Sequence, residues 1–298
     1  MTNTPLADWQ FDLAGLVIGH GTDIPVSDIE QQTEQRTADV PIPGEDGTFP
    51  GRDLLGSRTL RIEAGIRTPG DPEAALALLA RLEQTAADPA VRTTAGSTAV
   101  LRAKRPGQGV RRLVGRVRRA GAVSMARAVH GWIPVEIEFT ATDPAWQADD
   151  LSGLTVGLDP GAQLGQGFTA PLRAPITTGV ATPEARPGWA TNRGDRAAWP
   201  SLRITGPVVN PSVWVVETGQ RLDLAITLAV GEYLDIETAP GTRWLMLNGR
   251  SYAAGALRSG RLDRLTLPPG RSEIRWTALD YSGTSRLAVT WRDTYNSL

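Results

Sequence analysis

Two glutamates, Glu136 and Glu138, come closest to the spacing of a catalytic pair. They lie in the run WIPVEIEFTATDPAW (residues 132–146), whose alternation of apolar and charged residues is typical of a β-strand. On a strand they would share one face about 7 Å apart, a separation that inverting glycosidases use. However, any half-exposed strand places charges in this way, and such a face lacks the burial that a general acid needs. We therefore predict that this pair is structural.

The remaining candidates for chemistry are few. The chain has two histidines, His20 and His130, and no cysteine. No G-x-S-x-G motif accompanies either histidine, no further metal ligand is indicated, and thiol chemistry is impossible. The segment GQGFTA (165–170) fits a dinucleotide-binding pattern in its letters only, because Pro171 follows and no helical pattern begins there. We predict no catalytic, cofactor-binding or metal-binding residue, and we do not expect an enzyme.

Charge is distributed unevenly along the chain. Residues 1–99 carry 7 basic and 15 acidic side chains, residues 100–135 carry 9 basic and no acidic ones, and the net charge of the chain is −1. On the strand predicted for 111–119, Arg112, Arg116 and Arg118 share one face. A pI of about 6.2 and the lack of aromatic residues among these arginines argue against nucleic-acid binding. The alternatives for this hairpin (102–119) are a solvated strand face and a contact to the acidic residues 1–99. We expect the contact, in part between subunits.

Nine tryptophans are a further feature, and six of them lie from Trp189 onward. Strand patterns surround four, which are expected in a hydrophobic core: Trp214, Trp244, Trp276 and Trp291. Trp189 and Trp199 lie in loop-like sequence. These two are the better candidates for exposed contacts, such as stacking on a sugar.

The elements that would position these residues predict two domains, since 298 residues exceed the usual size of one core. The first domain, residues 1–150, is expected to be α+β. Its helix spans 71–87, with Asp71 as N-cap and Pro72 at the first position, and residues 20–58 are expected to form a loop. Period-2 alternation predicts its strands: 10–19 (a pair that bends at Gly15), 59–67, 98–104, 111–119 and 132–142.

The second domain, residues 151–298, is expected to be a β-sandwich of the jelly-roll or galectin-like kind. Residues 148–200 are rich in Gly, Pro and Thr, but from residue 201 strand patterns recur every eight to twelve residues. RLDLAITL (221–228) alternates as one strand, and Asn248 with Gly249 predicts a type I′ turn. No apolar run approaches the roughly 20 residues of a membrane span, and the first twenty residues do not have the pattern of a signal peptide.

The order of motifs in the second domain resembles that of siphophage distal tail proteins, the Dit-like phage tail component family. That pattern runs from an N-x-G segment through I-x-G-P, an N-P turn, a T-G turn and a strand of the type G-x-x-L-x-I-D to N-G. The corresponding residues here are Asn192, Gly194, Ile204, Gly206, Pro207, Asn210, Pro211, Gly219, Gly231, Asp235, Asn248 and Gly249. The ending of residues 132–146 also resembles the close of the ring domain of that family.

The resemblance implies a structural virion protein at the tail tip, a minor tail protein assembled in the host cytoplasm. It would form a homohexameric ring that joins the tail tube protein to the baseplate and to hub and receptor-binding proteins. DNA would pass through its lumen without specific binding, and no membrane insertion is expected. The alternative from another class is a soluble carbohydrate-binding protein whose second domain binds cell-wall glycan; an enzyme is the third possibility.

Overall fold

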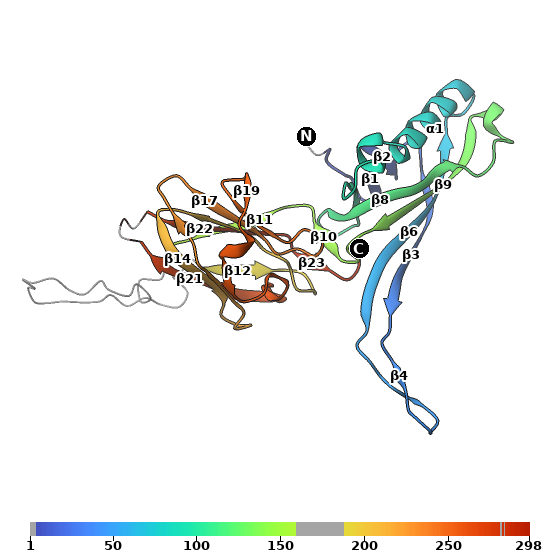
Figure 1. Cartoon of the computed structure of the whole chain (residues 1–298). Helices are drawn as coiled ribbons and strands as arrows, with labels where there is room; N and C mark the ends of the chain where they lie inside the picture. The colour runs from blue at the N-terminus through green and yellow to red at the C-terminus, as the bar shows by residue number, and fades with distance from the viewer. Residues whose placement is uncertain (1–3, 159–187, 281, 283) are drawn as a thin grey trace, which may run out of the picture. The chain divides into compact units, whose positions relative to one another are not determined.

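The structure is a computed structural model that describes residues 4–158, 188–280, 282 and 284–298 (Figure 1). It is mainly β, as predicted, and divides into two compact units: Met1–Asp149 with Tyr295–Leu298, and Asp150–Thr294. The sequence-based division at residue 150 assigned the last four residues to the second domain. In the structure they belong to the first.

The first unit is built on a nine-stranded sheet. Its main path has the order β2-β1-β7-β8-β9-β6-β3, and β10 and β23 pair beside it. The expected opening pair is β1 and β2, with Ala14 and Gly15 at positive φ in the turn between them. The strands span these residues: β1 Gln10–Leu13, β2 Leu16–Gly19, β3 Val26–Arg36, β6 Leu54–Arg67, β7 Ala99–Lys104, β8 Arg111–Ala122, β9 Trp132–Ala141, β10 Trp146–Ala148 and β23 Thr294–Tyr295.

One helix covers the buried face of this sheet. Helix α1 (Pro72–Ala86) begins as predicted. The Asp71 side chain accepts a hydrogen bond from Ala74 N at 2.9 Å. Pro72 has no backbone N–H group, so it leaves no unpaired donor in the first turn. Its buried residues are Ala75, Leu79 and Leu82. A short helix, α2 (Pro89–Arg92), follows with Asp88 as its cap, and the 3₁₀ turn η1 (Ala128–His130) precedes β9.

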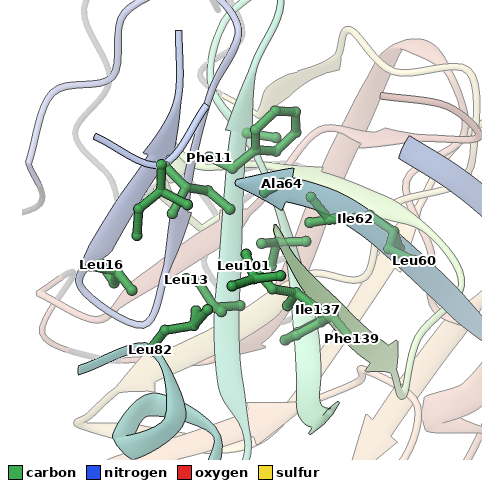
Figure 2. Packing of buried hydrophobic residues seen from close by; sticks show 14 of the residues in the cluster. Phe11, Leu13, Leu16, Leu60, Ile62, Ala64, Leu82, Leu101, Ile137 and Phe139 are labelled. Atoms are coloured by element: carbon green, nitrogen blue, oxygen red, sulfur yellow. The ribbon is translucent and has the colours of Figure 1, made fainter. Parts of the chain in front are cut away.

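The core of the first unit lies between α1 and the sheet (Figure 2). Phe11 and Leu13 from β1 meet Leu60 and Ile62 from β6 there, together with Phe139 from β9. The chain-terminal Leu298 also belongs to this core and is only 3% exposed. A residue from the far end of the sequence therefore completes the first unit.

The prediction of a loop over residues 20–58 is wrong. Strand β3 pairs with β6 along its length. Past the end of β9, which pairs with β6 only from Arg58 onward, the hairpin continues as an arm (residues 33–57) that carries the short pair β4 (Val40–Pro41) and β5 (Thr48–Phe49) (Figure 1). Most residues of β3 are exposed. With neither face fully buried, the sequence of β3 has no apolar alternation to reveal a strand.

The second unit is the predicted sandwich of two six-stranded sheets. The first has the order β11-β22-β13-β17-β18-β19: β11 Ser152–Val156, β22 Arg286–Trp291, β13 Ser201–Thr205, β17 Tyr233–Glu237, β18 Trp244–Leu247 and β19 Ser251–Tyr252. The second has the order β12-β21-β14-β15-β20, with β16 beside β14: β12 Trp189–Asn192, β21 Gly270–Leu279, β14 Val208–Val215, β15 Arg221–Leu224, β20 Leu257–Ser259 and β16 Thr227–Leu228. Two 3₁₀ turns, η4 (Ala254–Ala256) and η5 (Leu262–Arg264), flank β20.

Two local predictions in this unit have different outcomes. Asn248 and Gly249 both have positive φ between β18 and β19, which confirms the expected turn. RLDLAITL is not one strand but two, because the chain leaves the ladder after Leu224 and returns at Thr227. No helix in the described part of the chain is long and apolar enough to cross a membrane.

Candidate functional site

The candidate catalytic pair lies on the outer face of β9. Glu136 forms an ion pair with Arg119 on the neighbouring strand β8, with Arg119 Nη1 2.9 Å from Glu136 Oε2. Glu138 lies directly opposite Arg119 in the strand register. The arrangement is that of a partly exposed surface ion pair; that the two glutamates are structural stays a prediction.

The other residues considered for chemistry lie apart from one another. His20 and His130 are both exposed, in turns that belong to different parts of the first unit. Among the described residues no group of three or more His, Cys, Asp or Glu side chains is arranged to hold a metal ion. The segment 165–170 lies outside the described residues.

The predicted arginine face on β8 is interrupted. Val117 lies opposite Phe139 and Arg119 lies opposite Glu138, so Arg118 is an extra residue in a β-bulge. The bulge shifts the alternation of β8 from Arg119 onward, so the strand does not continue the regular pattern on which the prediction of one arginine face was based.

The basic stretch contacts the acidic first part of the chain, as expected, but these contacts lie within one chain. The Arg102 side chain is buried and lies 3.0 Å from Asp12 Oδ2 and 2.9 Å from Asp149 Oδ2. It also donates to the carbonyl of Thr4. On the surface, Lys104 Nζ lies 3.3 Å from Asp8.

Three further arginines bind the C-terminal segment Tyr295–Leu298. Arg58 donates to the carbonyl of Asn296 at 2.7 Å, Arg105 to that of Leu298 at 2.8 Å, and Arg111 to that of Ser297. The Arg111 guanidinium also lies 3.7 Å from the centroid of the Tyr295 ring. Sequence analysis missed this role, and no signal would have shown it, because the acceptors are backbone carbonyls.

Several exposed arginines of the first unit make no side-chain contact with the described residues, and two of them border the same hollow. Arg92 and Arg118 are exposed, and neither side chain makes a hydrogen bond or ion pair with any residue that the structure describes. They border a surface hollow of about 460 Å³ formed by the end of α1, by α2 and by β8, called the basic hollow below. Its floor includes small apolar side chains such as Val91 and Ala120.

The tryptophans of the second unit divide differently from the prediction. Trp276 and Trp291 are core residues, at 0% and 6% exposure. Trp214 and Trp244 are only half-buried, because they occupy outward positions of their strands. Trp189, expected in a loop, begins β12.

Arginine side chains lie over the rings of three half-buried tryptophans, Trp189, Trp199 and Trp214. The distances from guanidinium carbon to ring centroid are 4.1 Å for Arg271 over Trp189, 5.2 Å for Arg221 over Trp214 and 5.6 Å for Arg243 over Trp199.

Two aspartates of the second unit that several hydrogen bonds hold, Asp223 and Asp280, have strongly depressed pKa values. For Asp223, burial works to raise the pKa, but hydrogen bonds from Ser212, Ser259 and Arg221 outweigh it and lower the pKa from 3.8 to about 2. For Asp280, burial likewise opposes hydrogen bonds from Ser282 and Ser285, and the pKa is again lowered. The alternation of RLDLAITL puts Asp223 on the face opposite to its leucines, but nothing in the sequence marks Asp223 as special, because its serine partners come from other strands.

This pair of units defines a class of fold that is known among solved structures. The chain matches the structure of the Dit protein (gp 19.1) of phage SPP1 with a TM-score of 0.61 and 11% sequence identity, over 96% of this chain and 98% of that one. A chain of the phage P2 baseplate matches with a TM-score of 0.49 and 10% identity, over 94% of this chain and 97% of that one. No protein-family model and no curated protein match the sequence. The chain has a Dit-like fold.

Proposed function

We propose that this chain is a distal tail protein, a structural component of a phage tail. The observation that supports the proposal most is the fold likeness, which includes both units and nearly all of the SPP1 protein. That protein is described as a paradigm of the hub adsorption apparatus in phages that infect Gram-positive bacteria. Because a fold does not fix a function, the surfaces of the first unit are a second, independent support.

In this role the chain forms a homohexameric ring between the tail tube and the tail tip. Its partners are other copies of itself, the tail tube protein, and the hub and receptor-binding proteins of the tip. DNA passes through the lumen without specific binding. The protein is part of the virion after assembly in the host cytoplasm and carries out no catalysis.

A ring of identical subunits needs two different, complementary surfaces on each copy. The arm supplies one of them, since residues 33–57 carry five acidic and two basic side chains. It also exposes Val40, Phe49 and Leu54 at 58%, 60% and 45%. The basic hollow supplies the other, with the unused Arg92 and Arg118 beside apolar side chains. Opposite charge combined with apolar surface on both sides favours contact between copies.

The mass of the purified protein in solution tests this function. A ring former is expected to be oligomeric, with ring-shaped particles in electron micrographs, and high salt should weaken it because exposed charges are screened. A protein that stays monomeric at high concentration and low salt would contradict the proposal. Monomeric protein that binds cell-wall glycan would instead favour the carbohydrate-binding alternative.

A charge exchange tests the contact itself. Arg118→Glu is chosen because Arg118 has no side-chain partner among the described residues of its own chain, unlike Arg112 and Arg116. It should shift the population toward monomers, and Asp46→Arg on the arm should restore assembly in the double variant. Arg264→Glu, on an exposed arginine of the second unit, is the matched control and should assemble normally.

A further inference from the structure

A polar hollow of about 440 Å³ lies in the second unit, on the outer face of the sheet where β14, β15 and β20 are neighbours. Leu222 and Leu224 of β15 are buried in the sandwich core. The alternation of the strand therefore turns Arg221 and Asp223 outward. The size is within the range of small-ligand sites.

The centre of the hollow is a fixed carboxylate. Asp223 accepts hydrogen bonds from Ser212 Oγ and Ser259 Oγ at 2.5 Å each and from Arg221 Nε at 2.6 Å. Both serines lie directly opposite Asp223 in the strand register, one on each neighbouring strand. Three donors from three strands hold this acceptor in one orientation, as a preorganised binding group requires.

Unused hydrogen-bond donors surround the carboxylate. Arg258 and Asn210 line the hollow, and neither side chain bonds to any residue in the described part of the chain. Asn210 has a φ of 49° and lies at a bulge of β14, which sets it apart from the regular ladder. Arg221 uses Nε on Asp223 and lies over the Trp214 ring, which fixes its plane.

A carboxylate acceptor beside guanidinium and amide donors restricts the class of ligand that the hollow can bind. A divalent cation would meet a single carboxylate beside the guanidinium groups of Arg221 and Arg258, and a simple anion would meet the charge of Asp223. A hydroxyl group satisfies both sides, because it donates to a carboxylate and accepts from a guanidinium or an amide. We propose that this hollow binds a neutral saccharide, with Asp223 as acceptor and Arg258 and Asn210 as donors. The proposal does not depend on ring formation and adds a ligand to the second unit.

The test uses the full chain and measures saturation-transfer NMR with neutral glucose, galactose and N-acetylglucosamine disaccharides. Arg258→Met keeps the apolar stem and removes the donors, and Asn210→Gly removes the amide while tolerating positive φ. Each is expected to weaken binding at least tenfold with an unchanged Tm. Arg264→Met removes another exposed arginine outside the hollow and should bind like the unaltered protein.

Other outcomes overturn the proposal. Absence of binding up to a Kd of about 10 mM, or binding that both hollow variants retain, would mean that the Asp223 network only joins three strands. Binding of inorganic sulfate with no response to the disaccharides would make it an anion site. Oligomeric state is measured on the same samples, so a failure here is distinguishable from a failure of the ring proposal.

Discussion

The two units use their arginines in opposite ways. In the first unit, Arg58, Arg105 and Arg111 bind carbonyls 238, 193 and 186 positions away in the sequence. In the second unit, three arginines bind carboxylates two positions away, as in the exposed pairs Arg221 with Asp223 and Arg261 with Asp263. The longer-range exception is Arg203, which binds Asp235 on a neighbouring strand.

Contacts between distant segments and contacts between near neighbours in the sequence differ in how much they stabilise the fold. A contact between distant segments holds the fold together, so its loss leaves buried groups without partners. A contact between neighbours on a strand orients two side chains that the backbone has already brought together, and such exposed pairs contribute little stability. The first unit is therefore expected to be sensitive to loss of an arginine, and the second to be tolerant.

The largest effect is expected from Arg102→Met. It leaves the Asp12 carboxylate, which is 10% exposed, without the Arg102 guanidinium, which should cost about 3–5 kcal/mol. The free energy of unfolding in denaturant measures it. Arg61→Met removes an exposed pair of the same unit, with Glu30 at 3.8 Å, and should cost less than about 1 kcal/mol. Equal effects of the two variants would remove the distinction between buried and surface arginines.

The next effect is expected from Leu298→Ala. The side chain is 3% exposed in the core of the first unit, and such truncations cost about 2–5 kcal/mol. Val123→Ala, at a residue of the same unit with 61% exposure, is the control and should change little. A loss of stability confined to the second unit, seen by hydrogen exchange, would show that the C-terminal segment does not support the first.

The sequence predicted those elements in which one face is buried. Val135, Ile137 and Phe139 alternate in β9, and Asp71 caps α1, so both were evident. Strand β3 was missed because it exposes both faces, and the role of Tyr295–Leu298 was missed because backbone carbonyls carry no sequence signal. Cross-strand sites such as Asp223 with Ser212 and Ser259 depend on register, which alternation alone does not supply.

A smaller effect is expected on the pH dependence of the free energy of unfolding, through Asp223 of the second unit. The folded pKa of Asp223, about 2, is below the ordinary 3.8. Its contribution to stability is therefore complete above about pH 4 and is lost as the pH falls toward 2. Asp223→Asn should flatten the acid limb of the stability curve by less than about 1.4 kcal/mol per pH unit. Asp150→Asn, at an exposed aspartate, should leave it unchanged, and an unaltered limb in Asp223→Asn would show that Asp223 is not held by its three donors.

The smallest effect is expected at a surface ion pair of the first unit that resembles the exposed ion pairs of the second unit. Arg119 and Glu136 form a partly exposed pair between adjacent strands, so replacing Glu136 and Glu138 by Gln should change the free energy of unfolding by less than about 1 kcal/mol. A glycosidase needs one of its two carboxyl groups buried and protonated near neutral pH, whereas Glu136 is a partly exposed side chain paired with Arg119. Incubation of the unaltered protein with purified cell wall should release no reducing sugar. Release that disappears in the double Gln variant would identify an active site on this face, and the ion pair would then be part of its chemistry rather than of the surface.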